Sequence, residues 1–133
     1  MDVFEYITKN LNPPQKDAVE TLNGPLLILA GAGSGKTRVL THRMANMIAM
    51  GHCAPDEILC VTFTNKAAKE MEARIYKILA DLGVPIRSQL WVSTFHSFCV
   101  RILRQHLTLL DYKPHFGIYD SADTLSQIKK VMK

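Results

Sequence analysis

The stretch from Leu26 to Thr37 constrains the fold of this chain more than any other. It opens with a continuous apolar run, residues 26–30, which has the length and composition of a buried strand. Three glycines then punctuate the chain, and a Lys-Thr pair, Lys36 and Thr37, opens an amphipathic segment. The sequence therefore predicts a buried strand, a glycine-rich turn and a helix in immediate succession.

A turn of this composition between a strand and a helix is typical of a phosphate-binding loop. Backbone N–H groups can surround phosphate oxygens only in conformations that glycine reaches without steric cost, and the helix directs its positive end at the same anion. We expect Lys36 to reach the terminal phosphates and the Thr37 hydroxyl to ligate Mg²⁺. The expected cradle consists of Ala30, Gly31, Ala32, Gly33, Ser34, Gly35, Lys36 and Thr37. The alternative is a turn that binds nothing, and the usual pattern begins with glycine where this chain has Ala30.

Composition describes an ordinary globular chain of 133 residues, 47% hydrophobic and 21% charged, for which one domain is expected. No apolar run is long enough for a transmembrane helix, and the first residues lack the pattern of a signal peptide, so we expect no membrane partner. The three cysteines are widely spaced and odd in number, which favours free thiols in a reducing cytoplasm over disulfides or structural zinc. The net charge of +4 is compatible with a nucleic-acid partner without requiring one.

The remaining pattern alternates strands with helices, which predicts β-α-β units and an α/β fold with a parallel sheet. Helices are expected over about 13–22, 36–50, 64–82 and 97–110 and after residue 120, a short helix or turn over 1–10, and strands over 26–30, 58–63 and 90–94. On the helix after the glycine-rich turn, the expected core stripe is Leu40, Met44, Met47 and Ile48. Arg38 is expected either to touch a nucleotide or to be exposed, and His42, His52, His106 and His115 to lie at surface or cap positions.

Four stretches, taken in this order, resemble the superfamily 1 DNA helicases of the UvrD/Rep/PcrA group. Residues 11–15 resemble the Q motif, residues 30–37 motif I, residues 61–71 motif Ia and residues 93–97 motif Ib. The resemblance runs from Leu11 to about His106. It implies that ATP binds with Mg²⁺, that Gln15 recognises adenine, and that alanine at position 30 is normal. The alternative for Gln15 is a capping-box glutamine, three residues after the N-cap Asn12.

The resemblance also implies that motifs Ia and Ib contact single-stranded DNA. An aromatic ring beside polar and basic groups can stack an unpaired base and hold the neighbouring phosphate. The residues that fit this description are Phe63, Thr64, Asn65 and Lys66 in one stretch and Thr94, Phe95 and His96 in the other. The alternatives are that Phe63 belongs to the core and Lys66 to a solvated helix face. His96 has no second ligand at metal spacing.

Hydrolysis also needs an acidic pair at a strand end and an arginine for the developing charge, and the family supplies these downstream of motif Ib. We find no convincing substitute here. The chain is therefore expected to be the N-terminal part of the first motor lobe of a RecA-like, three-layer P-loop fold. Residues 1–110 would form the ATP-binding part of lobe 1A and residues 111–133 the incomplete start of the inserted helical subdomain 1B.

The function that the resemblance implies is that of an ATP-dependent DNA helicase and single-stranded-DNA translocase, whose second motor lobe lies in the rest of the chain. Residues 1–133 alone are expected to bind ATP weakly with negligible turnover. The alternatives are a P-loop NTPase without unwinding activity and an inactive helicase-like binding subunit.

Overall fold

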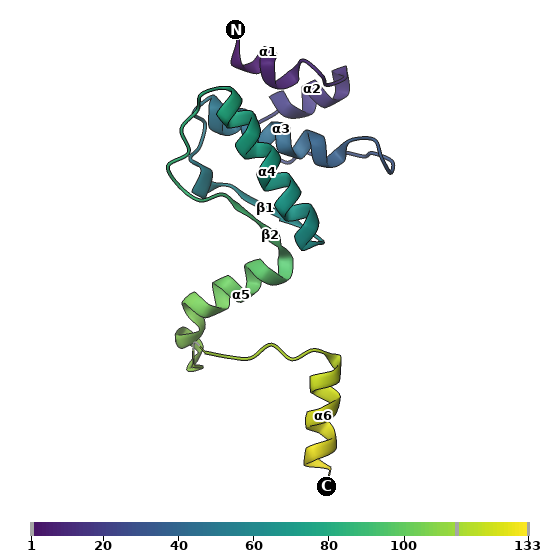
Figure 1. Cartoon of the computed structure of the whole chain (residues 1–133), viewed down its shortest axis with the longest axis vertical. Coiled ribbons are helices and arrows are strands. Elements are labelled where there is room, and N and C mark those ends of the chain that lie inside the picture. The colour runs from purple at the N-terminus through teal and green to yellow at the C-terminus, as the bar shows by residue number, and fades with distance from the viewer. Residues whose placement is uncertain (1, 114, 133) are drawn as a thin grey trace. The chain divides into compact units, whose positions relative to one another are not determined.

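The computed structural model describes residues 2–113 and 115–132. The chain divides into two compact units, which we call unit 1 (Met1–Phe95) and unit 2 (His96–Lys133). The elements of unit 1 are α1 (Val3–Thr8), α2 (Pro13–Glu20), α3 (Lys36–Ala49), the short 3-10 helix η1 (Pro55–Glu57), β1 (Leu59–Thr62), α4 (Asn65–Asp81) and β2 (Trp91–Thr94) (Figure 1). After β2 follow α5 (Phe95–His106), the 3-10 helix η2 (Leu107–Leu110) and α6 (Ser121–Val131).

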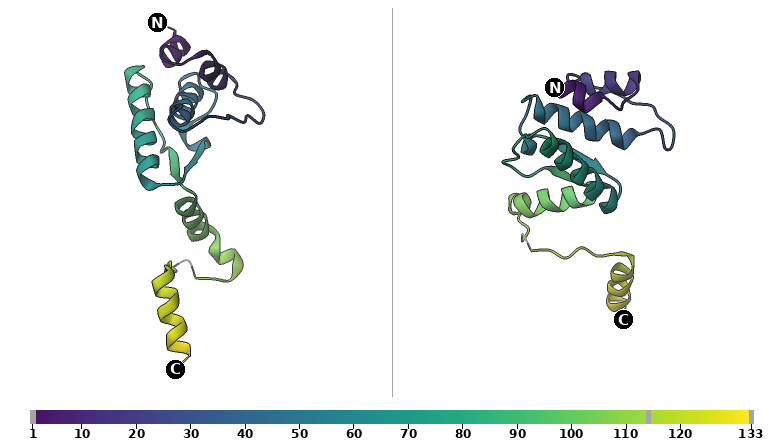
Figure 2. Two further views of the ribbon diagram at one scale, coloured as in Figure 1. Left: turned by 90° about the vertical axis from the view of Figure 1, so that its right-hand side faces the viewer. Right: turned by 45° about the horizontal axis from the view of Figure 1, so that its top comes forward.

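The two strands are parallel neighbours, and α4 is the crossover between them. Leu59 pairs with Trp91, and the register continues to Thr62 beside Thr94. Both views of Figure 2 show α4 lying along the strands, and α3 packs against α4. The predicted α/β architecture with a parallel sheet is therefore confirmed at the level of this small sheet.

Unit 1 has two clusters of buried side chains, and α3 contributes to both. The first lies between α3, α4 and β2 and contains Met44, Ala45, Ile48, Met71, Ile75, Leu79 and Leu90. The second lies between α1, α2 and α3 and contains Ile7, Leu11, Ala18, Val19 and Val39. Because α3 packs against helices on two sides, its buried arc is wider than one stripe. The prediction that Leu40 belongs to that stripe is wrong: Leu40 is 40% exposed, and its neighbour Val39 is buried.

The predicted strand over residues 26–30 is also wrong. This run has an irregular backbone, and Leu27 and Leu29 are 81% and 86% exposed. A strand needs a neighbouring strand to satisfy its backbone N–H and C=O groups. Among the described residues only β1 and β2 form a sheet, and they pair with each other. The apolar run therefore has the composition of a buried strand, but in the described part of the chain no strand lies beside it to pair with.

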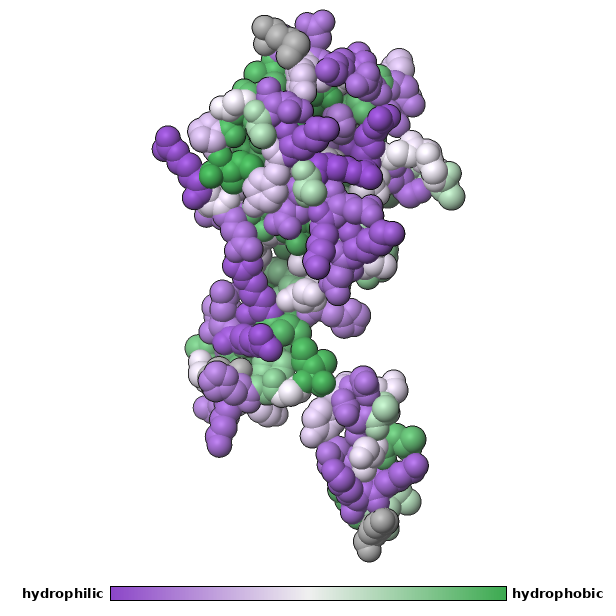
Figure 3. Space-filling view, in the orientation of Figure 1, coloured by the Kyte–Doolittle hydropathy of each residue, from purple (hydrophilic) through white to green (hydrophobic). Residues whose placement is uncertain are grey.

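Unit 2 consists of helices with exposed apolar faces. The helix expected over 97–110 begins earlier, at Phe95, and ends at His106, where it tightens into η2 and Asp111 takes a left-handed conformation (φ 59°). The helix expected after residue 120 is present as α6, and Asp120 caps it, since its Oδ1 accepts hydrogen bonds of 2.8 Å from the N–H groups of Ala122 and Asp123. No residue of α5, η2 or α6 is buried. Figure 3 shows hydrophobic side chains gathered over α5 and the segment after it.

The division into a motor-lobe part (1–110) and the start of an inserted subdomain (111–133) concerns a longer architecture and stays a prediction. Across the part of the chain that the structure describes, no helix combines the length and apolar character needed to cross a bilayer.

Candidate functional site

The loop that precedes α3 curls on itself at two glycines. Gly33 (φ 75°) and Gly35 (φ 90°) take left-handed conformations that side-chain-bearing residues rarely adopt. The Ser34 hydroxyl donates a hydrogen bond of 2.6 Å to the carbonyl oxygen of Gly31. The predicted glycine-rich turn is therefore present between the irregular run and α3.

Lys36 folds back over this loop. Its ammonium group donates hydrogen bonds to the carbonyl oxygens of Ala30 (2.9 Å) and Gly31 (2.7 Å). Lys36, Thr37 and Arg38 are all exposed at the start of α3. A positive charge thus lies at the mouth of the loop, within reach of an anion that enters it.

The N-terminal end of α3 has no side-chain cap. Gly35 is its N-cap residue and offers no acceptor, whereas α1, α2, α4 and α6 are capped by Asp2, Asn12, Thr64 and Asp120. The first N–H groups of a helix have no partner within the helix, and the helix dipole adds a partial positive charge there. This end of α3 suits an anion.

Gln15 connects α2 to the loop. Its Oε1 accepts from the N–H of Asn12 (3.1 Å) and its backbone N–H donates to Asn12 Oδ1 (3.0 Å), so the capping box is confirmed. Its Nε2 donates to the carbonyl oxygen of Ser34 (3.0 Å). A side-chain amide has a second N–H and a second lone pair, so each end retains the capacity for one more hydrogen bond.

A cleft of about 330 Å³ lies between α2 and the loop. It is lined on one side by Pro14 and Gln15 and on the other by Ala30, Ser34 and Lys36. The structure therefore brings together two stretches that the sequence analysis assigned to one ligand. The cleft adjoins the uncapped end of α3, so one ligand can contact both.

Three residues that the sequence analysis did not assign to this region fasten α1 and α2 to α3. Arg43 Nη1 donates to the carbonyl oxygen of Ala18 (2.9 Å), and Asn46 Nδ2 donates to that of Val19 (3.4 Å). His42 is half-buried, and its Nδ1 donates to the carbonyl oxygen of Ile7 (2.6 Å) in the last turn of α1, so of the two predicted positions the structure supports the cap, here of another helix, and not the open surface. Burial lowers the pKa of His42. The helical spacing of these residues beside Val39 is the signal in the sequence that points to a second packed face.

Two exposed phenylalanines lie together at the ends of the strands. The register places Thr62 beside Thr94, so Phe63 and Phe95 emerge side by side. Their ring centroids are 6.3 Å apart with an interplanar angle of 51°. Phe63 is 94% exposed and Phe95 52%, so the alternative that Phe63 belongs to the core is wrong. Exposed rings in contact offer a surface on which a planar group can stack.

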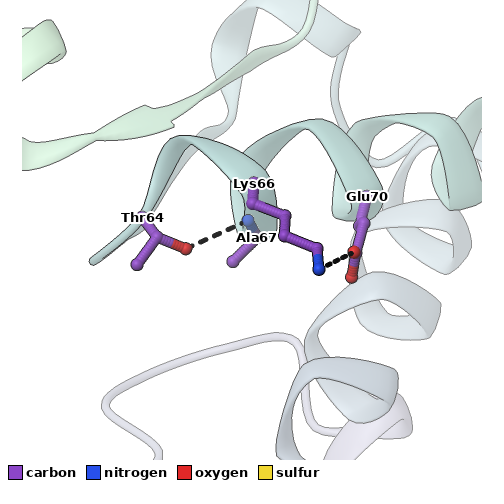
Figure 4. A network of polar contacts seen from close by, with 4 residues as sticks. All are labelled: Thr64, Lys66, Ala67 and Glu70. Carbon is purple, nitrogen blue, oxygen red and sulfur yellow. Dashed lines mark hydrogen bonds and ion pairs between the residues drawn. The ribbon is translucent and has the colours of Figure 1, made fainter.

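The polar residues after Phe63 begin α4. Figure 4 shows the Thr64 hydroxyl accepting from the N–H of Ala67 (3.1 Å) and Lys66 beside Glu70 (4.0 Å). Both Lys66 and Asn65 are exposed, and an exposed ion pair holds a lysine only weakly. Thr94 is buried at the end of β2. His96 belongs to unit 2, where it lines a groove on α5 with Ser97, Arg101 and Arg104.

A sequence model of the UvrD/REP helicase N-terminal domain matches residues 11–133. The chain belongs to this family. It is 53% identical over 131 residues to the ATP-dependent DNA helicase PcrA of Bacillus subtilis (strain 168). The matched region covers 98% of this chain and 17% of that protein. It is 50% identical over 127 residues to the protein of the same name from Staphylococcus epidermidis (strain ATCC 12228 / FDA PCI 1200), and 48% to that from Staphylococcus aureus (strain NCTC 8325 / PS 47), in each case over 96% of this chain and 17% of the relative. The chain thus spans 17% of the length of these curated relatives.

Membership of the UvrD/REP helicase family confirms the resemblance stated from the four motifs. The roles of individual residues within this family domain stay predictions. Among the described residues there is no group of three or more His, Cys, Asp and Glu side chains that could hold a metal ion, and Cys53, Cys60 and Cys99 are free thiols.

Proposed function

We propose that this chain is the nucleotide-binding portion of an ATP-dependent DNA helicase that moves along single-stranded DNA. The observation that carries the proposal is the cleft in which Gln15 of α2, the loop before α3 and the Lys36 ammonium meet. The names of the relatives, ATP-dependent DNA helicase, support the same activity. The function supports a cytoplasmic location, which agrees with the free thiols of all three cysteines.

The residues of the cleft fit a nucleoside triphosphate. The loop from Gly31 to Gly35 has the positive-φ glycines that a backbone cradle requires, and the uncapped end of α3 supplies unpaired N–H groups. Lys36 would exchange the carbonyl oxygens of Ala30 and Gly31 for phosphate oxygens, which are better acceptors for an ammonium ion. We propose that Ala30, Ala32, Ser34 and Arg38 complete this contact surface. When bound, ATP supplies the free energy for movement through cleavage of its terminal phosphate.

We propose that two further residues bind the metal ion and the base of the nucleotide. Thr37 would hold Mg²⁺ through its hydroxyl. Gln15 would read adenine with the second N–H and the second lone pair of its amide, which the contacts with Ser34 and Asn12 leave available. Adenine presents a donor and an acceptor that one amide can meet with a pair of hydrogen bonds.

We propose that single-stranded DNA binds at the strand ends. Phe63 and Phe95 would stack unpaired bases, and the polar groups around them would contact the neighbouring phosphates. The exposed groups beside Phe63 are Thr64, Asn65 and Lys66. We further propose roles in DNA binding for Thr94, which is buried and would act by positioning Phe95, and for His96 of unit 2. Nucleotide and DNA sites in one lobe allow the state of the nucleotide to change the affinity for DNA.

We propose that the complete lobe has the RecA-like, three-layer P-loop fold, of which this chain supplies residues 1–110 and the start of subdomain 1B (111–133). The exposed run at residues 26–30 supports this proposal, because its apolar composition suits a central strand flanked by further strands. The second motor lobe would supply the arginines, and downstream residues the acidic pair. Residues 1–133 alone are therefore expected to bind ATP weakly and to hydrolyse it at a negligible rate, and measurable turnover by this chain alone would contradict that expectation.

The test is Lys36→Ala in the full-length protein, with Lys77→Ala on the exposed face of α4 as the matched control. We expect K36A to reduce the DNA-stimulated rate of ATP hydrolysis by about 100-fold or more, because a charge that stabilises the transferred phosphate is lost, and K77A to change it little. Translocation along single-stranded DNA and strand displacement are measured in parallel. Unchanged translocation in K36A would favour an inactive binding subunit, and an ATPase rate insensitive to single-stranded DNA would favour an NTPase of another kind.

A further inference from the structure

The side chain of Gln15 makes two contacts that do not involve a base. Its Oε1 holds the N–H of Asn12 at the start of α2, and its Nε2 holds the carbonyl oxygen of Ser34 in the loop. The two partners are 22 residues apart in sequence, counted from Asn12 to Ser34. One side chain therefore joins the first turn of α2 to the backbone of the loop that precedes α3.

The loop packs directly against this amide. A Cβ atom added to Gly35 would lie 3.0 Å from Gln15 Nε2, closer than nine in ten real Cβ contacts. Gly35 is also the residue at which α3 begins. The Gln15 amide therefore lies against the residue at which the loop ends and the uncapped helix begins.

The helix that carries Gln15 is itself fixed in place. Ala18 and Val19 are buried, and their carbonyl oxygens accept hydrogen bonds from Arg43 and Asn46 of α3. The C-terminal half of α2 is thus fastened to the middle of α3, and Gln15 fastens its first turn to the loop. A side chain on an anchored helix can hold a loop in one position.

We propose that Gln15 is a positioning residue for the phosphate loop, separately from any contact with adenine. Its amide fixes the Ser34 carbonyl and so sets the place of the loop and the start of α3 for the incoming phosphates. This inference rests on the proposed nucleotide site. It has a consequence that adenine reading alone does not have: a polyphosphate without a base should also depend on Gln15.

The experiment compares inorganic tripolyphosphate with a non-hydrolysable ATP analogue, both with Mg²⁺, by calorimetric titration of the full-length protein. In Gln15→Met both amide contacts are lost while the side chain keeps its length. Because one neutral hydrogen bond is lost between the helix and the loop, we expect Q15M to weaken tripolyphosphate binding by about three- to tenfold. If Gln15 only reads the base, Q15M weakens the ATP analogue and leaves tripolyphosphate unchanged, and the inference is overturned.

Two further variants separate the loop contact from helix stability. Gln15→Glu keeps an acceptor for the N–H of Asn12, and so the capping box, but has no donor for Ser34. Its added charge also repels phosphate, so its affinity is measured at low and high salt, where screening removes the repulsion but not the lost hydrogen bond. Arg43→Met removes the arginine contacts at the other end of α2, where Asn46 and the buried side chains of Ala18 and Val19 still hold the helix, and it leaves the contact between Gln15 and Ser34 in place. We expect Q15E to stay weaker than wild type at high salt and R43M to bind tripolyphosphate within about twofold of wild type.

Each outcome bears on one of the two proposals. Binding of neither ligand by the wild-type protein removes the nucleotide site itself, and the inference with it. Binding of the ATP analogue but not of tripolyphosphate, or equal weakening in R43M and Q15M, leaves the nucleotide site standing and overturns the role of Gln15 in the loop.

Discussion

The two units of this chain use the same sequence pattern with different results. In unit 1, the apolar stripe of α4 is buried at Ala68, Met71, Ile75 and Leu79, against α3 and the strands. In unit 2, α5 and α6 also have apolar stripes, and none of their residues is buried. Helical periodicity therefore predicts which face of a helix is apolar, whereas burial depends on whether another element covers that face.

The same contrast is present inside unit 1. The apolar run at residues 26–30 has the composition of a central strand, yet Leu27 and Leu29 are exposed. Its neighbours in sequence, α2 and α3, are packed against each other, and α2 is capped by Asn12. A strand depends on distant parts of the chain for its backbone hydrogen bonds, whereas a helix satisfies most of its own.

The largest effect should separate the cores of the two units. Ile75→Ala removes a fully buried side chain from α4 and is expected to lower the free energy of unfolding by about 2–5 kcal/mol, through lost burial and the cavity left behind. Ile128→Ala on α6, where the side chain is half exposed, is expected to change it by less than about 0.5 kcal/mol. Urea unfolding of the 133-residue chain measures both.

Equal losses in I75A and I128A would contradict the account that, among the residues the structure describes, the core lies in unit 1 alone. A large loss for I128A in the full-length protein alone would show that another segment covers α6 there.

A smaller effect should come from the helix caps. Thr64 caps α4 of unit 1 and Asp120 caps α6 of unit 2. We expect Thr64→Ala to lower the free energy of unfolding by about 1 kcal/mol, because an N–H at the start of a packed helix loses its acceptor. Asp120→Ala should reduce helicity by circular dichroism and leave the urea midpoint unchanged, since α6 adds little to the global transition. A shift of the midpoint in D120A equal to that in T64A would show that unit 2 unfolds together with unit 1.

The smallest effect concerns pH. Burial lowers the pKa of His42, so the native state binds its proton more weakly than the unfolded state does. The contribution of neutral His42 to stability is therefore complete above the ordinary pKa of histidine and is lost as the pH falls toward the lowered value. His42→Gln keeps a donor for Ile7 without titrating, and its urea midpoint should fall less than that of wild type between about pH 7.5 and pH 5.5. His106→Gln, at an exposed position in unit 2, is the control, and an equal pH response in wild type and H42Q would refute the role of His42.

Much of unit 1 could be predicted because its signals are local. Asn12 and Gln15 formed the expected capping box, and α4 and the two strands begin and end within a residue of their predicted positions. The side chains that join elements could not be predicted in the same way. Arg43 and His42 donate hydrogen bonds to backbone carbonyl oxygens of other helices. Because every residue has a backbone carbonyl group, the sequence does not show which one accepts. The contact between Phe63 and Phe95 depends on the register of two strands that α4 separates.

The sequence predicted the two motifs of the candidate site, but it did not predict the hydrogen bond from Gln15 to Ser34 that connects them. The sequence offered adenine recognition and helix capping as alternatives for Gln15. The side chain caps α2 and also reaches Ser34, a contact that depends on how the loop curls at Gly33 and Gly35. The chemistry of a site is thus visible in residue types, whereas its geometry depends on the packing of α2 against α3.

The most direct test of the account is a titration of the isotopically labelled 133-residue chain with Mg²⁺ and ATP, followed by the backbone and side-chain amide signals in NMR spectra. The account predicts weak binding with the largest shifts at Gly33, Gly35 and Lys36 and at the side-chain amide of Gln15, while the amides of α6 stay unchanged. Two results would contradict the assignment of the nucleotide site to the loop before α3. One is a set of shifts confined to unit 2. The other is the absence of any shift in the 133-residue chain at an ATP concentration well above the one that saturates the full-length protein.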